Sequence, residues 1–207
     1  MLVVEKNGLI RWGSIAGIAG AITFLTLWGM AIIVDGHWIF GIETLSELGG
    51  DRPGRLFFNS AAIIMGVATL LFASALYRRM RRTLLEKVST LTFALSSILL
   101  VGVGLFPIDT GAAHTFFSWS FFIVVIASLT LMFFPCQRNM GLRSMGTIAL
   151  TGVLVIAYVT MTLVALDIIE LAMSEALIVI ALNVWEITNG FLILFDQERQ
   201  VIPCVST

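Results

Sequence analysis

The sequence predicts an all-α integral membrane protein, one domain over residues 1–207 that forms a bundle of six transmembrane helices. Hydrophobic residues make up 58% of the chain and charged residues only 12%, whereas a soluble domain carries roughly 25% charged residues. The mean hydropathy is +1.01. Because so little charge is available to cover a water-exposed surface, we expect a bilayer to cover most of the protein.

Six stretches are long and apolar enough to cross the ~30 Å hydrocarbon core, which takes about 20 residues of helix. They are residues 13–34, 56–77, 88–106, 115–134, 145–166 and 172–195. A transmembrane barrel would instead alternate polar and apolar residues over segments of ~10 residues. Residues 121–134 are apolar on all sides, which favours helices.

Small and turn-forming residues account for the first three helices. Gly13 and Gly17 are four residues apart in the first helix, a spacing that lets a second helix approach closely. Pro53 and Gly54 turn the chain into the second helix. Pro107 ends the third helix, since proline has no amide hydrogen for the helical hydrogen-bond pattern.

Lysine and arginine predict the orientation of the bundle. Arg52 and Arg55 fall on one side, and the other side holds ten basic residues: Lys6, Arg11, Arg78, Arg79, Arg81, Arg82, Lys87, Arg138, Arg143 and Arg199. Basic residues favour the cytoplasmic side, so both termini are predicted to be cytoplasmic and the protein to lie in the cell membrane. The cluster Arg78, Arg79, Arg81 and Arg82 is a candidate contact for anionic lipid headgroups.

The net charge of −1 disfavours a nucleic-acid partner, because binding phosphates takes a surplus of basic residues. The expected partners are membrane lipids. No metal and no cofactor are predicted, since the chain has only two histidines and catalytic zinc takes three protein ligands.

The first outer loop, residues 35–55, contains the most informative short pattern. Thr44 and Glu47 have the spacing of a capping box, in which each side chain bonds the backbone of the other residue. Ile42, Leu45 and Leu48 recur every three residues. The pattern predicts a short amphipathic helix that lies at the membrane interface.

A second candidate lies where the third and fourth helices meet. Asp109 follows the helix-ending proline, and His114 opens the fourth helix. A carboxylate and an imidazole at this spacing suit a proton relay or half of a metal site. Asp109 could equally cap the fourth helix and bond His114. In either case we expect direct or one-water contact between them, with Glu47 or Asn59 as a further partner.

Polar residues also occur deep in the sixth helix. Asn183, Glu186 and Asn189 recur every three residues, and Glu186 falls near the middle of the bilayer. A charge there costs ~2.5–3.5 kcal/mol on insertion scales. Glu186 is therefore expected to face the interior of the bundle and to bond a neighbouring helix, with Thr160 and Thr162 as candidate partners.

The chain resembles a prokaryotic family of six-helix membrane proteins, the domain of unknown function DUF998. The likeness rests on residues 46–49 (Ser-Glu-Leu-Gly), 58–59 (Phe-Asn), 102–109 (Gly-Val-Gly-Leu-Phe-Pro-Ile-Asp) and on His114. The Phe-Pro-x-Asp element with its following histidine is also similar to the Frag1/DRAM/Sfk1 group. The first resemblance implies that Ser46, Glu47, Asn59, Asp109 and His114 are the marked positions of the family, and it supplies no reaction.

Three functions are consistent with these features. The first is binding of a lipid or small molecule at a polar cluster near the outer face, formed by Ser46, Glu47, Asn59, Asp109 and His114. The second is a membrane-embedded hydrolase or lipid-modifying enzyme with Asp109 and His114 as acid and base, and Glu47 as a further candidate. The third is a small proton-coupled transporter that uses Glu186.

Overall fold

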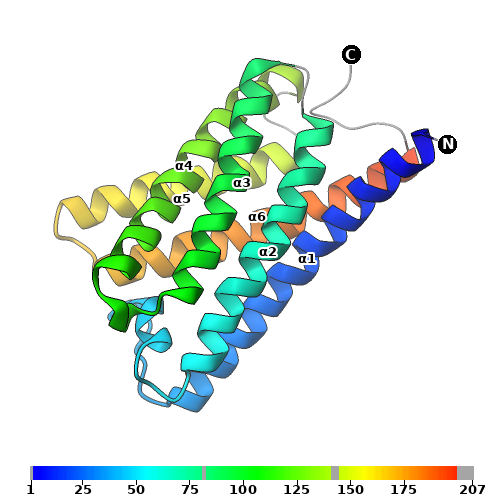
Figure 1. The fold of residues 1–207 in the computed structure, drawn as a ribbon. Coiled ribbons are helices and arrows are strands. Elements are labelled where there is room, and N and C mark those ends of the chain that lie inside the picture. Colours follow the sequence, from blue (N-terminus) through cyan, green and yellow to red (C-terminus); the bar gives the residue numbers. More distant parts are fainter. Residues whose placement is uncertain (1, 81–82, 141–144, 200–207) are drawn as a thin grey trace.

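The computed structural model describes residues 2–80, 83–140 and 145–199. Most of these residues are helical (Figure 1). They form six α-helices and two short 3-10 helices: α1 (Leu2–Asp35), η1 (Leu45–Gly49), α2 (Arg55–Arg79), α3 (Leu84–Leu105), η2 (Ile108–Thr110), α4 (Ala112–Met140), α5 (Met145–Ala165) and α6 (Leu171–Arg199).

Each α-helix contains a stretch that is long and apolar enough to cross a membrane, so the predicted fold class is confirmed. The stretches are Gly8–Asp35, Arg55–Arg79, Leu84–Leu105, Ala112–Pro135, Met145–Ala165 and Leu171–Phe195. The largest difference from prediction is at the start of the first stretch, at Gly8 rather than residue 13. The chain is a multi-pass membrane protein.

The helices pack in an order that leaves one seam loosely filled. α1 packs along α2, α2 along α3 and α3 along α4, and α6 packs on both α1 and α5 (Figure 1). Contacts between α4 and α5 are sparse by comparison. The seam between these two helices is where a cavity opens.

Aromatic residues form the centre of the main core. Phe72 of α2, Phe93 of α3 and Trp185 of α6 meet edge to face, with ring centroids 5.3–6.5 Å apart. All three side chains are almost fully buried. Edge-to-face pairs at this separation are favourable because the positive ring edge meets the negative ring face. These rings fix α2, α3 and α6 against one another.

η1 is inserted between helices rather than lying on the surface. Leu45 and Leu48 are 2% and 0% exposed, and both belong to the second hydrophobic core. Asn59 Nδ2 of α2 donates to the carbonyl of Gly49 over 2.9 Å, and Trp38 Nε1 donates to the carbonyl of Thr44 over 2.9 Å. A short helix thus forms as predicted, but Ile42 lies outside it and is 66% exposed, and Leu45 and Leu48 pack into one end of the bundle.

The capping box predicted at Thr44 and Glu47 is absent. Thr44 makes no side-chain cap hydrogen bond, and the amide of Glu47 bonds the Thr44 carbonyl instead, over 3.2 Å. The same four-residue pattern does form a capping box at Thr83 and Glu86, at the start of α3. The difference is that η1 is a 3-10 helix, in which the Glu47 amide already bonds the Thr44 carbonyl. The first amides of an α-helix have no partner within the helix, so the third amide of α3 bonds the Thr83 side chain.

The two ends of the bundle differ in charge. η1 and η2 lie at one end, which we call the η end, and the start of α1 and the end of α6 lie at the other (Figure 1). Arg78 and Arg79 end α2 at that opposite end, and Arg81 and Arg82 lie outside the described residues. That the η end faces outward is still a prediction from the distribution of basic residues.

Candidate functional site

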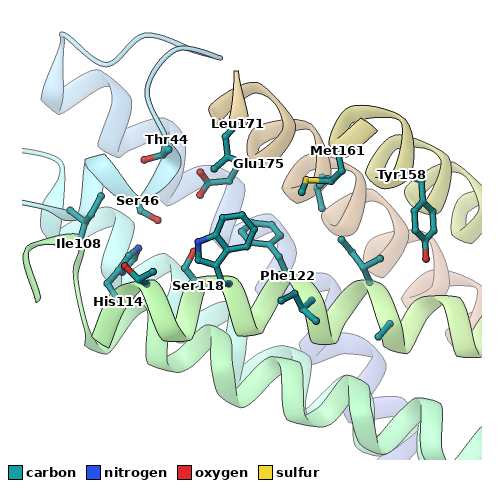
Figure 2. A pocket seen from close by; sticks show the side chains of 16 residues that line it. Thr44, Ser46, Ile108, His114, Ser118, Phe122, Tyr158, Met161, Leu171 and Glu175 are labelled. Carbon is teal, nitrogen blue, oxygen red and sulfur yellow. The ribbon is translucent and has the colours of Figure 1, made fainter. Parts of the chain in front are cut away.

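A cavity of about 480 Å³ opens between α4 and the pair α5–α6, and it reaches the η end. We call it the α4–α5 groove (Figure 2). It is lined by Thr44, Ser46, Ile108, His114, Thr115, Ser118, Trp119, Phe122, Ile123, Ile126, Ala127, Tyr158, Met161, Leu171, Glu175 and Ile178. Half of these residues come from α4 alone, so the groove runs along one helix.

Polar side chains gather at one end of the groove. Thr44, Ser46, His114, Ser118 and Glu175 lie toward the η end in Figure 2, and we call this group the polar end. The groups come from α4, α6, η1 and the residue before η1. Because η1 is packed inside the bundle, it delivers Ser46 to the cavity as a buried residue, 5% exposed.

The turn between α3 and α4 positions His114. α3 ends before Pro107, and Gly111 adopts φ +62°, which lets the chain reverse into α4. His114 Nδ1 then lies 2.7 Å from the carbonyl oxygen of Phe106. That oxygen can only accept, so Nδ1 carries the hydrogen, and in the neutral ring Nε2 is the acceptor. The ring is 6% exposed, and its orientation is fixed by the end of the preceding helix.

Glu175 is the acidic residue of the polar end. It lies in the second turn of α6, beside the backbone of Leu45 and the hydroxyl of Ser46 (Figure 2). Glu47 is close enough to interact with it electrostatically. The sequence does not single out Glu175, because the rotation of α6 about its axis follows from packing that the sequence does not reveal.

The rest of the groove is apolar and faces outward. Trp119, Ile123 and Tyr158 are 47%, 63% and 53% exposed, and all three line the groove. Tyr158 of α5 also shares a hydrogen bond of 2.9 Å with Thr130 of α4. This bond ties α4 to α5 at the end of the groove that lies opposite the polar end.

The five positions implied by the resemblance do not share one set of contacts. Ser46 and His114 line the groove, whereas Glu47, Asn59 and Asp109 do not. Asn59 holds η1 through the Gly49 carbonyl, and one buried oxygen of Glu47, Oε2, has no hydrogen-bond partner in the described structure. The predicted contact between Asp109 and His114 is not among the hydrogen bonds of the described residues, since each has another partner.

Both arginines of the η end, Arg52 and Arg55, form ion pairs with nearby acids. Arg52 pairs with Asp35 over 3.5 Å and with Glu43 at shorter range. Its guanidinium lowers the pKa of Glu43 through that hydrogen bond, so Glu43 remains ionised near neutral pH. Arg55 lies 4.0 Å from Asp109, and both side chains are about half exposed. Within the described residues, no three histidine, cysteine, aspartate or glutamate side chains are grouped to hold a metal ion.

The intramembrane polar residues lie away from the groove. Glu186 is 3% exposed, and its two carboxylate oxygens lie 3.1 and 3.2 Å from the donating hydroxyl of Thr69 in α2. The predicted partners Thr160 and Thr162 are therefore wrong. Both hydroxyls donate to backbone carbonyls of their own helix, at Ile156 and Tyr158.

The amides on either side of Glu186 also bond within their own helix. Asn183 donates to the carbonyl of Val179 over 2.8 Å, and Asn189 donates to that of Trp185 over 2.9 Å. Glu186 accepts a hydrogen bond from a different helix, through Thr69 of α2.

Comparison with known proteins places the chain in a family. The model of the family described as "Protein of unknown function (DUF998)" matches residues 18–191. The chain belongs to this family. The matched segment contains the whole α4–α5 groove and η1. No curated protein and no solved structure matches the chain. The DUF998 description names no ligand or reaction, so the function has to be argued from the groove.

Proposed function

We propose that this DUF998 chain binds a lipid or another amphiphile in the α4–α5 groove. The carrying observation is that a single cavity of about 480 Å³ changes from polar to apolar along its length. Cavities of ~300–1,000 Å³ hold small molecules, mostly through apolar walls with a few placed polar groups. The head of the amphiphile would meet Ser46, His114 and Glu175, and its chain would follow α4.

The length of the groove suits a chain from one leaflet. His114 and Ala127 mark its two ends on α4, and thirteen residues of helix at 1.5 Å each span about 20 Å. One leaflet contributes about half of the ~30 Å hydrocarbon core. An acyl chain whose head group lies at the η end would therefore occupy the same depth of the bilayer as the groove. In the predicted orientation, that head group belongs to the outer leaflet.

Entry is expected to be lateral. Trp119, Ile123 and Tyr158 are exposed on the flank of the bundle, where in a membrane the neighbouring molecules are lipids. An acyl chain there can move into the groove without losing an apolar environment. The gain on binding then comes from close packing and from hydrogen bonds at the polar end, because transfer from lipid supplies little hydrophobic driving force.

Photolabelling tests this function. The probe is a twelve-carbon alcohol with a diazirine at its apolar end, added to the protein in phosphatidylcholine vesicles. We expect labels to concentrate on residues 119–127 of α4 and on Tyr158 and Met161 of α5. Ala127→Trp adds a large ring at the apolar end of the groove and should lower that labelling several-fold, because bulky side chains occupy the volume that the chain needs.

The matched control is Leu91→Trp, which adds a tryptophan to a 57% exposed position on α3, outside the groove. It should leave the labelling of α4 and α5 unchanged. Uniform labelling of all lipid-facing helices, with no difference between the two variants, would overturn the proposal.

The two alternative functions gain no specific support from the described residues. An enzyme using Asp109 and His114 needs both groups within hydrogen-bond reach, yet Asp109 pairs with Arg55 and His114 with the Phe106 carbonyl. A transporter using Glu186 needs a path to that residue, and Glu186 lines neither the groove nor the smaller cavity beside it.

A further inference from the structure

A second, smaller cavity adjoins the polar end. Its volume is about 30 Å³, close to the volume that one water molecule takes up in the liquid. Ser46, Ser118 and Glu175 line both this cavity and the α4–α5 groove. A compact head group could therefore pass from the groove into the smaller cavity and keep the same three polar neighbours.

The ionisable side chain of the small cavity is an acid. Among the described residues, Glu175 is the one acidic or basic residue that lines the small cavity, and the groove adds His114 but no lysine or arginine. Glu47 interacts with it electrostatically, and Glu47 Oε2 is buried without a hydrogen-bond partner in the described structure. The two arginines of the η end, Arg52 and Arg55, form ion pairs with acids other than Glu175.

The walls of the small cavity also favour a cation. Four of its lining residues are phenylalanines, Phe24, Phe58, Phe121 and Phe122. Aromatic faces attract cations through the ring quadrupole, and more strongly where water is excluded. The two hydroxyls and the carboxylate provide three acceptors, which is the number of hydrogens that a primary ammonium donates.

We infer that the amphiphile of the α4–α5 groove is a single-chain primary alkylamine whose ammonium group enters the small cavity against Glu175, Ser46 and Ser118. This inference rests on the proposed function and adds the class of ligand. An aminophospholipid also carries an ammonium, but its phosphate would lie in a groove that no lysine or arginine lines. An alkylamine without a phosphate therefore fits the lining better, because the described lining contains Glu175 and no lysine or arginine.

A competition experiment measures the head-group preference. The protein in a neutral detergent is mixed with equal amounts of dodecylamine, dodecanol and dodecanoic acid, and the bound species are counted by native mass spectrometry. Wild-type protein should bind the amine at least about tenfold better than the alcohol, because a charge-assisted contact contributes ~1.5–3 kcal/mol. Dodecanoic acid should bind least, since its carboxylate would face Glu175.

Two variants test whether the preference for the amine over the alcohol depends on residues of the small cavity. Glu175→Gln should reduce the amine-to-alcohol ratio to near one while alcohol binding persists, and Ser118→Ala should reduce the ratio several-fold. Glu170→Gln is the matched control, because Glu170 is an exposed acid at the same end of the bundle that lines neither cavity. It should keep the wild-type ratio, and thermal unfolding of each variant checks that it is folded.

The outcomes separate this inference from the proposed function. Equal binding of amine and alcohol, unchanged by Glu175→Gln, would overturn the inference and leave the proposed function standing. Preference for dodecanoic acid, or better binding of lysophosphatidylethanolamine than of dodecylamine, would overturn it as well. Loss of all binding together with uniform photolabelling would instead contradict the proposed function.

Discussion

Gly66→Ala is expected to destabilise the protein by about 1–3 kcal/mol, the usual cost of forcing an extra group into a packed interior. α2 and α3 touch at this glycine. A Cβ atom there would lie 2.7 Å from the Ser97 carbonyl oxygen and 2.9 Å from the Val101 amide nitrogen. Both are backbone atoms, which no rotamer change can move aside, so the two helices would have to separate.

The measurement is the thermal unfolding midpoint in detergent, which should fall by several degrees for a chain of this length. Gly152→Ala is the control, because Gly152 is also helical and a Cβ there meets nothing within 4 Å. It should be neutral or slightly stabilising, since alanine favours helix more than glycine does. Equal losses in the two variants would show that α2 and α3 are not in close contact at Gly66.

The second large effect is expected at Glu186. Its carboxylate is buried and accepts from Thr69, which links α6 to α2. Glu186→Ala would leave the Thr69 hydroxyl without this partner and create a cavity beside Phe72 and Gly17, where the carboxylate now lies. The expected loss is about 2–4 kcal/mol, measured by the same unfolding experiment.

Glu186→Gln should lose less than ~1 kcal/mol, because glutamine has the same shape and can keep the hydrogen bond to Thr69. The pair of variants therefore separates a structural hydrogen bond from a required charge. If glutamine is as damaging as alanine, Glu186 must carry a charge that the fold needs, and the present assignment of a link between helices fails.

The six helices could be predicted from the sequence because the bilayer imposes a length and a composition on any spanning segment. The α3 stretch ends at Leu105, two residues before the helix-ending Pro107, and the α6 stretch reaches Phe195 as predicted. The family was also predicted, from the motifs around Ser46, Asn59 and Asp109, and the match over residues 18–191 confirms it.

The loops and the site were less predictable because they depend on contacts between distant residues. Thr44 and Glu47 match the capping-box pattern, but burial of Leu45 and Leu48 determines the conformation of η1. Similarly, Asp109 and His114 are close in the sequence, yet His114 bonds the end of α3. Local spacing predicts which residues can meet, and it does not show which competing partner is preferred.

The groove itself could not be predicted from the sequence. It depends on how sparsely α4 packs against α5, and this is a property of two helix surfaces. Glu175 illustrates the same limit, because only the rotation of α6 brings it to Ser46 and Ser118. Ser118 follows His114 by four residues, one turn of α4, and both residues line the groove.

Anomalous diffraction tests the central claim, that an amphiphile lies in the α4–α5 groove, most directly. Crystals of the protein grown in a lipid phase would be soaked with 12-bromododecan-1-ol and measured at the bromine absorption edge. We predict an anomalous peak between Ala127 and Tyr158, at the apolar end of the groove, with density for the chain that continues to the polar end. A bromine peak found only on other lipid-facing surfaces, with the groove empty, would contradict the account.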